Sequence, residues 1–200
     1  TKLFSVLSAT YNTYKFNVSS DINPANAVRM DYEIQQLSGK ADFSYQLNDK
    51  NLLSFGASAM RYDLSPGTLT PIGSESLISA DRLDDEQALE SAVYLGDEFE
   101  LSPRLTLYAG LRYSFYNYLG PRSVFQYAPG QPRSESSMTD TLQYEKGQSI
   151  ATYHGPEFRA SARYMLGKDA SIKVSYQRMR QYIHMLSNTT AISPTDTWKL

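Results

Sequence analysis

The sequence predicts an all-β protein: an antiparallel β-barrel that crosses a membrane, with about seven strands of a larger barrel in this chain. Three observations predict it. Apolar and polar residues alternate with a period of two, the alternating segments are long, and short connections alternate with long ones. Strands of soluble proteins average about 5–6 residues, whereas a tilted membrane strand needs about 9–11. The predicted strands lie near residues 3–18, 29–47, 51–63, 87–101, 104–118, 156–166 and 170–184.

The composition excludes several classes of protein. The chain has 200 residues, a net charge of −2 and no cysteine. The charge balance gives no sign of a nucleic-acid partner, and the missing cysteine excludes a disulfide scaffold and cysteine-ligated metal sites. No stretch approaches about 18 consecutive apolar residues, so a transmembrane helix is not expected. The 16 tyrosines suit boundaries where one end of a ring is dry and the other is wet.

The segment Ser102–Tyr118 shows the alternation most clearly. One set of alternate residues is apolar, and the other is polar, small or carries a hydroxyl. The segments 37–47, 157–166 and 170–176 repeat this pattern. We expect the apolar set to face lipid; in the first segment it comprises Leu105, Leu107, Ala109, Leu111 and Phe115.

Three turn signals connect consecutive strands: Asn48–Lys50, Ser102–Arg104 and Gly167–Asp169. Treated as three-residue loops, they place the apolar faces of both strands on the same side of each hairpin. The expected opposed pairs are Tyr45 with Leu53, Phe43 with Phe55, Leu101 with Leu105, and Tyr164 with Ile172. The long connections Leu64–Asp85 and Gly120–Gly155 would then lie outside the cell, because outer-membrane barrels have short periplasmic turns and long extracellular loops.

The polar face carries charges that suit a wet interior. Alternation alone is also typical of a half-buried sheet in a soluble sandwich. In lipid, however, a strand is stable only in a closed barrel, since unpaired edge groups would find no water. Seven strands do not close such a barrel, so we interpret residues 1–200 as part of one barrel domain. The charged residues expected in the lumen are Lys40, Asp42, Arg112, Arg159, Arg163 and Lys173.

Two stretches resemble TonB-dependent outer-membrane receptors. The first is Gly96–Ser114, "GDEFELSPRLTLYAGLRYS", which contains the L-x-x-G-L-R-Y pattern that recurs in barrels of this class. The second is Gly155–Leu200, which is similar to a stretch later in the same barrels. The chain looks closest to the branch that carries a carboxypeptidase-regulatory-like domain before the plug.

The resemblance implies a barrel of roughly 22 strands in the outer membrane of a Gram-negative bacterium, filled by an N-terminal plug. It implies active uptake of a scarce ligand, with the plug domain outside this sequence. The implied partners are outer-membrane lipid, the plug and an inner-membrane energy-coupling protein; a surface lipoprotein is left open, and nucleic acid is not expected. Two alternatives stay open: a passive porin-like channel and a soluble β-rich surface-binding module.

Nothing in the sequence indicates an enzyme, a cofactor or a metal site. The acidic run Asp81–Glu90 lacks the spacing of an EF-hand loop. The register places His154 opposite Tyr182 and diagonal to His184 at the extracellular rim, with no third ligand evident. Asp97 breaks the apolar pattern on the outward face, near enough to the Ser102 turn for a place at the membrane interface.

The loop Gly120–Gly155 is the main candidate for ligand capture, because it is far longer than the usual connection of roughly 4–6 residues. It mixes arginine with aromatic residues, the types most often found as binding anchors. A loop that only packs against its neighbours, or against a partner protein at the cell surface, is the alternative. The candidate residues are Tyr116, Tyr118, Arg122, Phe125, Tyr127 and Arg133.

Overall fold

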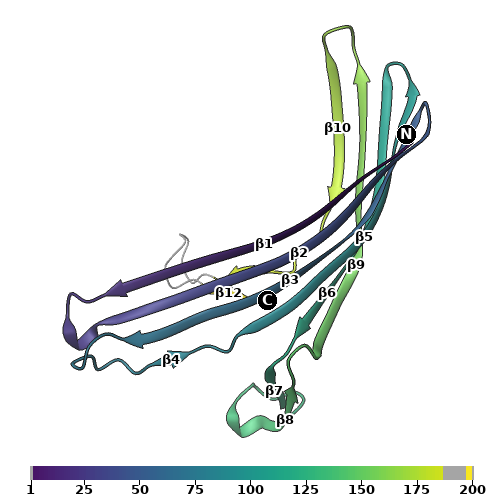
Figure 1. The fold of residues 1–200 in the computed structure, drawn as a ribbon. Helices are drawn as coiled ribbons and strands as arrows, with labels where there is room; N and C mark the ends of the chain where they lie inside the picture. Colours follow the sequence, from purple (N-terminus) through teal and green to yellow (C-terminus); the bar gives the residue numbers. More distant parts are fainter. Residues whose placement is uncertain (1, 187–196, 200) are drawn as a thin grey trace.

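Seven long strands and one short strand form a curved antiparallel sheet (Figure 1). The computed structural model describes residues 2–186 and 197–199. The seven strands that the alternation predicts are all present, and each pairs with the next one along the chain. They are β1 (Leu3–Ser20), β2 (Val28–Asn48), β3 (Asn51–Pro71), β5 (Glu86–Ser102), β6 (Leu105–Leu119), β9 (Ser149–Met165) and β10 (Ser171–Arg178), and the short β4 (Asp81–Arg82) pairs with β3.

Smaller elements lie away from this sheet. A hairpin of β7 (Arg122–Tyr127) and β8 (Met138–Tyr144) extends from one end, and β11 (His184–Leu186) pairs with β12 (Thr197–Lys199). The turns η1 (Pro24–Asn26) and η2 (Glu135–Ser137) are single 3-10 turns. In the described ranges no helix has the length and apolar character needed to cross a membrane.

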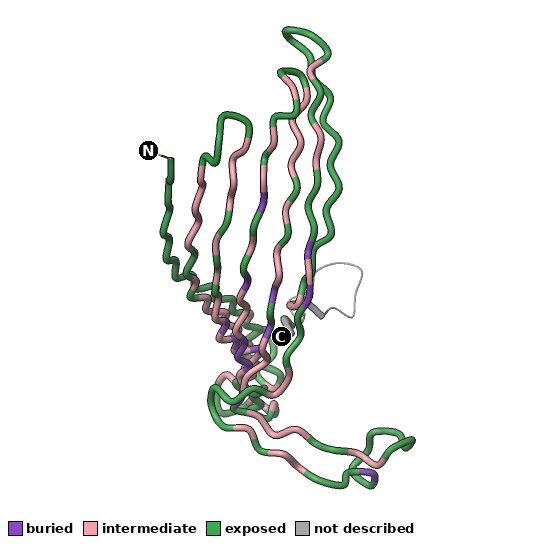
Figure 2. Tube along the Cα trace, turned by 90° about the vertical axis from the view of Figure 1, so that its right-hand side faces the viewer, coloured by how far each residue is buried: buried purple, intermediate pink, exposed green. Residues whose placement is uncertain are grey.

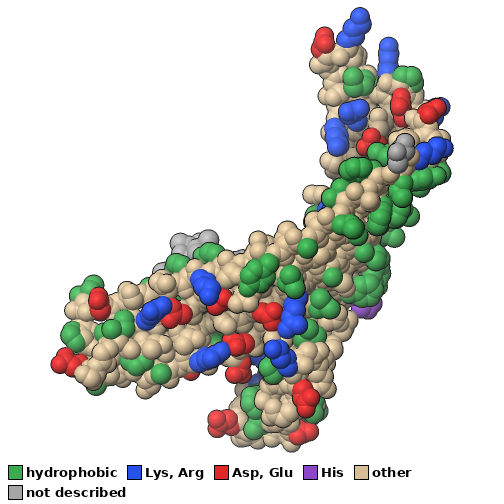
Figure 3. All heavy atoms as spheres, viewed as in Figure 1, with side chains coloured by type: hydrophobic (Ala, Val, Ile, Leu, Met, Phe, Trp, Pro, Cys, Tyr) green, Lys and Arg blue, Asp and Glu red, His purple; other side chains and the backbone are tan. Residues whose placement is uncertain are grey.

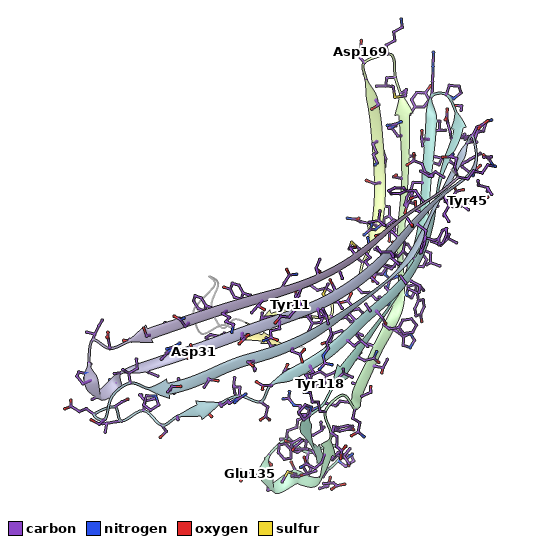
Figure 4. The ribbon with its side chains drawn as sticks, in the orientation of Figure 1. Tyr11, Asp31, Tyr45, Tyr118, Glu135 and Asp169 are labelled. Atoms are coloured by element: carbon purple, nitrogen blue, oxygen red, sulfur yellow. The ribbon has the colours of Figure 1, made fainter. Side chains whose placement is uncertain are left out.

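Short and long connections lie at opposite ends of the sheet, as predicted. Figure 4 shows Tyr45 and Asp169 at the end with the tight turns, and Asp31 and Glu135 at the end with the long connections. Buried residues are concentrated toward the long-connection end (Figure 2). The sheet therefore has one end built for tight turns and another built from extended loops.

The register of the hairpins follows the prediction with one correction. Tyr45 pairs with Leu53, Phe43 with Phe55, and Tyr164 with Ile172. Leu101 does not pair with Leu105, because Ser102 pairs with Leu105 and an irregularity between Glu100 and Ser102 absorbs the extra residue. Such a bulge leaves Leu101 unpaired. Beyond it, Glu100 pairs with Thr106 and Phe99 with Leu107, in the predicted register.

The long connections are more ordered than the prediction of loops at Leu64–Asp85 and Gly120–Gly155. Strand β3 continues to Pro71, and β9 already begins at Ser149. The β7–β8 hairpin occupies most of the rest of the second connection. Continued strand pairing satisfies backbone groups that a structureless loop would leave to water.

The end of β10 also differs from the prediction. Its pairing with β9 stops at Arg178, which lies opposite Phe158, instead of continuing to residue 184. The predicted position of His154 opposite Tyr182 is therefore wrong: Tyr182 instead stacks on Tyr116 of β6. The side chain of His184 lies outside the described part of the structure.

The two faces of the sheet differ as the alternation predicts. One row of register partners runs through Asp42, Gly56, Tyr94, Arg112 and Glu157 on successive strands. The neighbouring positions of opposite parity carry exposed apolar side chains, among them Leu7, Val93, Leu95, Leu111 and Val174. In Figure 3 hydrophobic side chains gather in a band below the charged turns. The band is the surface expected to meet lipid, and the polar row lines the interior.

Cysteine labelling of the membrane-inserted protein tests this assignment of faces. Lipid-facing positions should react with a membrane-soluble thiol reagent, and inward positions with a water-soluble one, because neighbouring residues on a strand point to opposite faces. Labelling that ignores parity would contradict the register. The outward sites are Leu107, Leu111, Ala160 and Val174, and the inward sites are Arg112, Arg159 and Lys173.

Candidate functional site: the inner wall and the extracellular rim

A charged patch lies on the inner wall near the middle of the sheet. Lys40 and Asp42 of β2 form an ion pair with an Nζ–Oδ1 distance of 2.8 Å. The hydroxyl of Tyr94 on β5 donates a hydrogen bond to the same Asp42 oxygen, and the Lys40 ammonium lies 5.8 Å from the centre of the Tyr94 ring. These side chains line a hollow of about 220 Å³ together with Arg112, Glu157 and Arg159.

Arg112 of β6 lies between two carboxylates. Its guanidinium is 3.8 Å from Glu90 on β5 and 3.8 Å from Glu157 on β9. Glu157 is buried, with 6% of its surface exposed. Arg112 therefore links β5, β6 and β9 through its two carboxylate partners. Replacing it would leave the buried Glu157 carboxylate without a compensating charge.

Glycines let tyrosine rings lie against this wall. A Cβ atom at Gly56 would overlap the carbonyl oxygen of Ala41 and the hydroxyl of Tyr94. A Cβ atom at Gly110 would lie 2.8 Å from the Tyr108 hydroxyl. At both positions the missing Cβ atom lets a tyrosine side chain lie close to the backbone. The Tyr94 hydroxyl reaches Asp42 across the space that a Cβ atom at Gly56 would occupy.

Three predicted lumen cations lie on β9 and β10, and one of them, Arg159, lines the same hollow as the charged patch. Arg163 of β9 lies directly opposite Lys173 of β10. Arg159 lies on the same face of β9, and Ser161 separates it from Arg163. None of the three forms an ion pair with a residue that the structure describes. Like charges directly opposite on a sheet destabilise it. Of the six predicted lumen residues, Lys40, Asp42 and Arg112 are thus paired within the wall, and the other three form no ion pair with a described residue.

An aromatic cluster closes the inner wall toward the loops. Tyr62, Ala88 and Tyr116 are buried together, and the Tyr182 ring stacks on Tyr116 at 5.1 Å between centroids. The Tyr182 hydroxyl lies 2.9 Å from the Ser114 Oγ. Tyr116, a predicted ligand residue, is only 2% exposed and belongs to this packing.

The root of the β7–β8 hairpin is fixed by a buried carboxylate. Arg122 Nη1 donates to Glu86 at 2.7 Å and also to the Tyr118 hydroxyl. Burial of the guanidinium is the largest single influence and lowers the pKa of Arg122, but the interactions with Glu86 and Tyr118 together outweigh it, so this pKa lies above its usual value. Tyr118 and Arg122 therefore anchor the hairpin where it leaves the wall, and Figure 4 shows Tyr118 between wall and hairpin.

The remaining predicted ligand residues lie on the hairpin and its tip. The side chain of Phe125 is half exposed on β7. The guanidinium of Arg133 lies 5.8 Å from the centre of the Tyr127 ring. Of the six candidates, Tyr116 is therefore buried, Tyr118 and Arg122 lie at the root of the hairpin, and Phe125, Tyr127 and Arg133 lie further out on it.

A hollow of about 430 Å³ at the rim joins the two long connections. Arg122, Gln143 and Tyr144 from the hairpin line one part of it. The segment Arg82–Asp85 lines the other part, held by an Arg82–Asp85 ion pair at 2.8 Å and a Ser65–Asp85 hydrogen bond at 2.8 Å. Sequence reasoning missed the contribution of this acidic segment, because the hollow depends on how two distant loops meet.

His154 faces outward among aromatic residues. Its Nδ1 lies 2.6 Å from the Tyr113 hydroxyl, and its ring stacks near Tyr113 and Phe115. Across the described residues, no group of three or more His, Cys, Asp and Glu side chains is arranged to hold a metal ion. The surroundings of His154 are those of an aromatic girdle residue.

The apolar outer face and the charged inner face together define a wall segment of a transmembrane β-barrel. Residues 2–195 match the family model described as "TonB dependent receptor-like, beta-barrel". The chain therefore belongs to the TonB-dependent receptor β-barrel family, as the resemblance of its two stretches predicts.

A solved structure shares this fold. The chain superimposes on the protein titled "Copper transporter OprC" with a TM-score of 0.60 and 13% identity, covering 89% of this chain and 29% of that one. At this identity the likeness shows the fold alone, and the chain spans less than a third of that protein. No curated protein matches the chain in sequence.

Gly56→Ala tests the close packing of the inner wall. We expect it to lower the free energy of unfolding of the full-length receptor by about 1–3 kcal/mol, the usual cost of overpacking, because the backbone of Ala41 cannot move aside. Urea unfolding in lipid vesicles measures this. Gly39→Ala is the matched control, since a Cβ atom there would meet nothing within 4 Å. Equal losses for the two variants would contradict the packing argument.

Proposed function

We propose that this chain forms part of the wall of an active transporter in the outer membrane of a Gram-negative bacterium, which takes up a scarce ligand with energy passed from the inner membrane. The observation that carries the proposal is the match of residues 2–195 to the TonB-dependent receptor barrel family. The charged inner wall supports it, since such charges suit a wet or plugged lumen.

The inner wall divides into two functional parts in this proposal. Arg112 links β6 to β5 and β9 through its ion pairs with Glu90 and Glu157. Asp42 pairs with Lys40 on its own strand and is linked to β5 by the hydrogen bond from Tyr94. Arg159, Arg163 and Lys173 face the lumen without such partners in the described chain, and their role is to contact carboxylates of the plug. An anionic partner would remove the repulsion between Arg163 and Lys173.

Ligand capture is assigned to the extracellular rim. The hollow between the hairpin root and Arg82–Asp85 offers hydrogen-bonding groups of both charges. The exposed tip with Phe125, Tyr127 and Arg133 adds aromatic and cationic surface of the type found in binding sites. The competing role for the tip is contact with a surface lipoprotein.

A soluble binding module is the less favourable reading of the same chain. It would place a broad apolar face in water, including Leu7 at 76% and Val174 at 67% exposed. A passive porin-like channel has the same outer face and differs in its dependence on energy.

Depletion of solutes from the growth medium tests transport. Cells with and without the complete gene are compared by mass spectrometry of the medium, each with and without an uncoupler of the inner membrane. We expect gene-dependent loss of at least one solute, and we expect the uncoupler to abolish it. Depletion that persists with the uncoupler would indicate a passive channel, and recovery of the protein in the detergent-free soluble fraction would exclude both membrane readings.

Deletion of residues 125–133 tests the capture role of the hairpin. The variant keeps Arg122 and therefore the anchor to Glu86, so the barrel should still assemble. We expect uptake of the solute identified above to fall at least tenfold, roughly the loss of 1.4 kcal/mol of binding. If the barrel assembles and uptake is unchanged, the capture site lies elsewhere, and the connection Leu64–Asp85 becomes the better candidate.

A further inference from the structure

The chain beyond β10 leaves the sheet and lies on its inner face. Pairing of β10 with β9 stops at Arg178, although β9 itself extends further toward the long connections, to Ser149. In Figure 1 the chain runs from the end of β10 toward β3, and β12 contacts β3. Residues 179–183, the strap, link β10 to β11 at this level of the wall.

Contacts at both ends of the strap place it across several strands. At one end the Arg180 guanidinium lies against the backbone of Gly155 on β9, where a Cβ atom would overlap it. At the other end Ile183 packs against the buried cluster that includes Tyr62 of β3 and Ala88 of β5. The strap therefore crosses the inner wall from β9 toward β3.

A row of small residues makes room for the strap. The register aligns these residues on inward positions of β9, β6, β5 and β3: Gly155, Ser114, Ala92 and Ser58. The Tyr182 hydroxyl lies 2.9 Å from Ser114 Oγ, and Ser114 is fully buried. The Tyr182 ring stacks on the neighbouring Tyr116 at 5.1 Å between centroids. Tyr182 therefore anchors the middle of the strap to β6.

The strap separates two hollows of the inner wall. On its extracellular side a hollow of about 330 Å³ lies between the strap and wall residues that include Gln36 and Glu90. On its periplasmic side lies the charged hollow, lined by residues that include Tyr94 and Arg112. On β5 the row of small residues, at Ala92, falls between Glu90 of the first hollow and Tyr94 of the second. A ligand that moves along this wall from the rim to the charged patch therefore meets the strap.

The strap is held by few polar contacts. Besides those described above, the described chain adds one weak contact, from the Arg159 guanidinium to the Met179 sulfur at 4.0 Å. No described residue forms an ion pair with the strap. The Gln181 amide donates to the Ile183 carbonyl, which lies within the strap itself. Segments with few buried contacts open locally at a free-energy cost well below that of global unfolding, so this segment is suited to move.

We propose that the strap is a gate on the path of the ligand along the inner wall. Seated on the row of small residues, it closes the wall between the two hollows. When it moves away, the two hollows join and the ligand reaches the charged patch. The passage of ligand rests on the transport function proposed above, whereas the movement of the strap does not.

Spin-label distances in the membrane-inserted protein test whether the strap moves. Labels are attached through Gln181→Cys on the strap and Lys168→Cys in the tight turn between β9 and β10, and double electron–electron resonance measures the distance between them. We expect one main distance in the presence of Tyr182 and a second, different one with Tyr182→Ala, because this substitution removes the stack and the hydroxyl contact.

The matched control pair is Gln177→Cys with Lys168→Cys, which should keep one distance because Gln177 belongs to β10. If Tyr182→Ala also changes the control pair, Tyr182→Leu replaces it, since leucine removes the same contacts and keeps more of the bulk. A strap distance that neither substitution changes would overturn the proposal.

A reversible cross-link tests whether this movement is needed for uptake. Gln36 and Gln181 line the same hollow from the wall and from the strap, so Gln36→Cys and Gln181→Cys can be joined by a bismaleimide with a central disulfide. We expect the cross-link to abolish uptake of the solute found by medium depletion, and a reductant that cleaves the linker to restore it. The cleaved linker leaves both adducts in the hollow, so recovery reports release of the strap and not removal of bulk.

Each single-cysteine variant treated with the same reagent is the control and should keep its uptake. Uptake that persists after complete cross-linking, or that stays lost after cleavage, would overturn the gate. If no solute is depleted in a gene-dependent manner, the proposed transport function fails instead, and the spin-label distances alone decide whether the strap moves.

Discussion

Backbone hydrogen bonding in lipid is the constraint on which this structure depends. Inside a membrane an unpaired N–H or C=O group finds no water, so every strand must pair along both of its edges. The register from β1 to β10 is continuous over the membrane-spanning length, and its irregularities lie near the turns or in the extracellular extensions. Within the described sheet β1 and β10 each have one partner, so closure of the barrel requires further strands against them.

Once the backbone is paired, the side chains decide what each face meets. The outward positions in the membrane-spanning rows are mostly apolar, and Asp97 is a charged exception that accepts a hydrogen bond from Asn51. The inward positions carry charge, and much of it is neutralised on the wall itself, as with Lys40 and Asp42. Arg163 and Lys173 lie opposite each other and form no ion pair with a residue that the structure describes.

The alternation predicted most of the fold because period two reports directly which face a residue occupies. It located all seven strands and the faces of Arg112 and Leu111. It missed the bulge at Leu101, because one extra residue in a turn leaves no trace in a hydrophobic pattern. It also missed the burial of Tyr116 under Tyr182 and the hollow at Arg82–Asp85, since both depend on segments that meet only in three dimensions.

The most direct test of the account compares arginine on the two faces of the full-length receptor in lipid vesicles. Leu111→Arg introduces a charge on the outward face, and Ser44→Arg introduces one on the inward face. The account predicts that the first lowers the free energy of unfolding by about 2–4 kcal/mol and the second by less than about 1 kcal/mol, because only the first charge is forced into hydrocarbon. Equal losses on the two faces would contradict the claim that this sheet separates lipid from a polar interior.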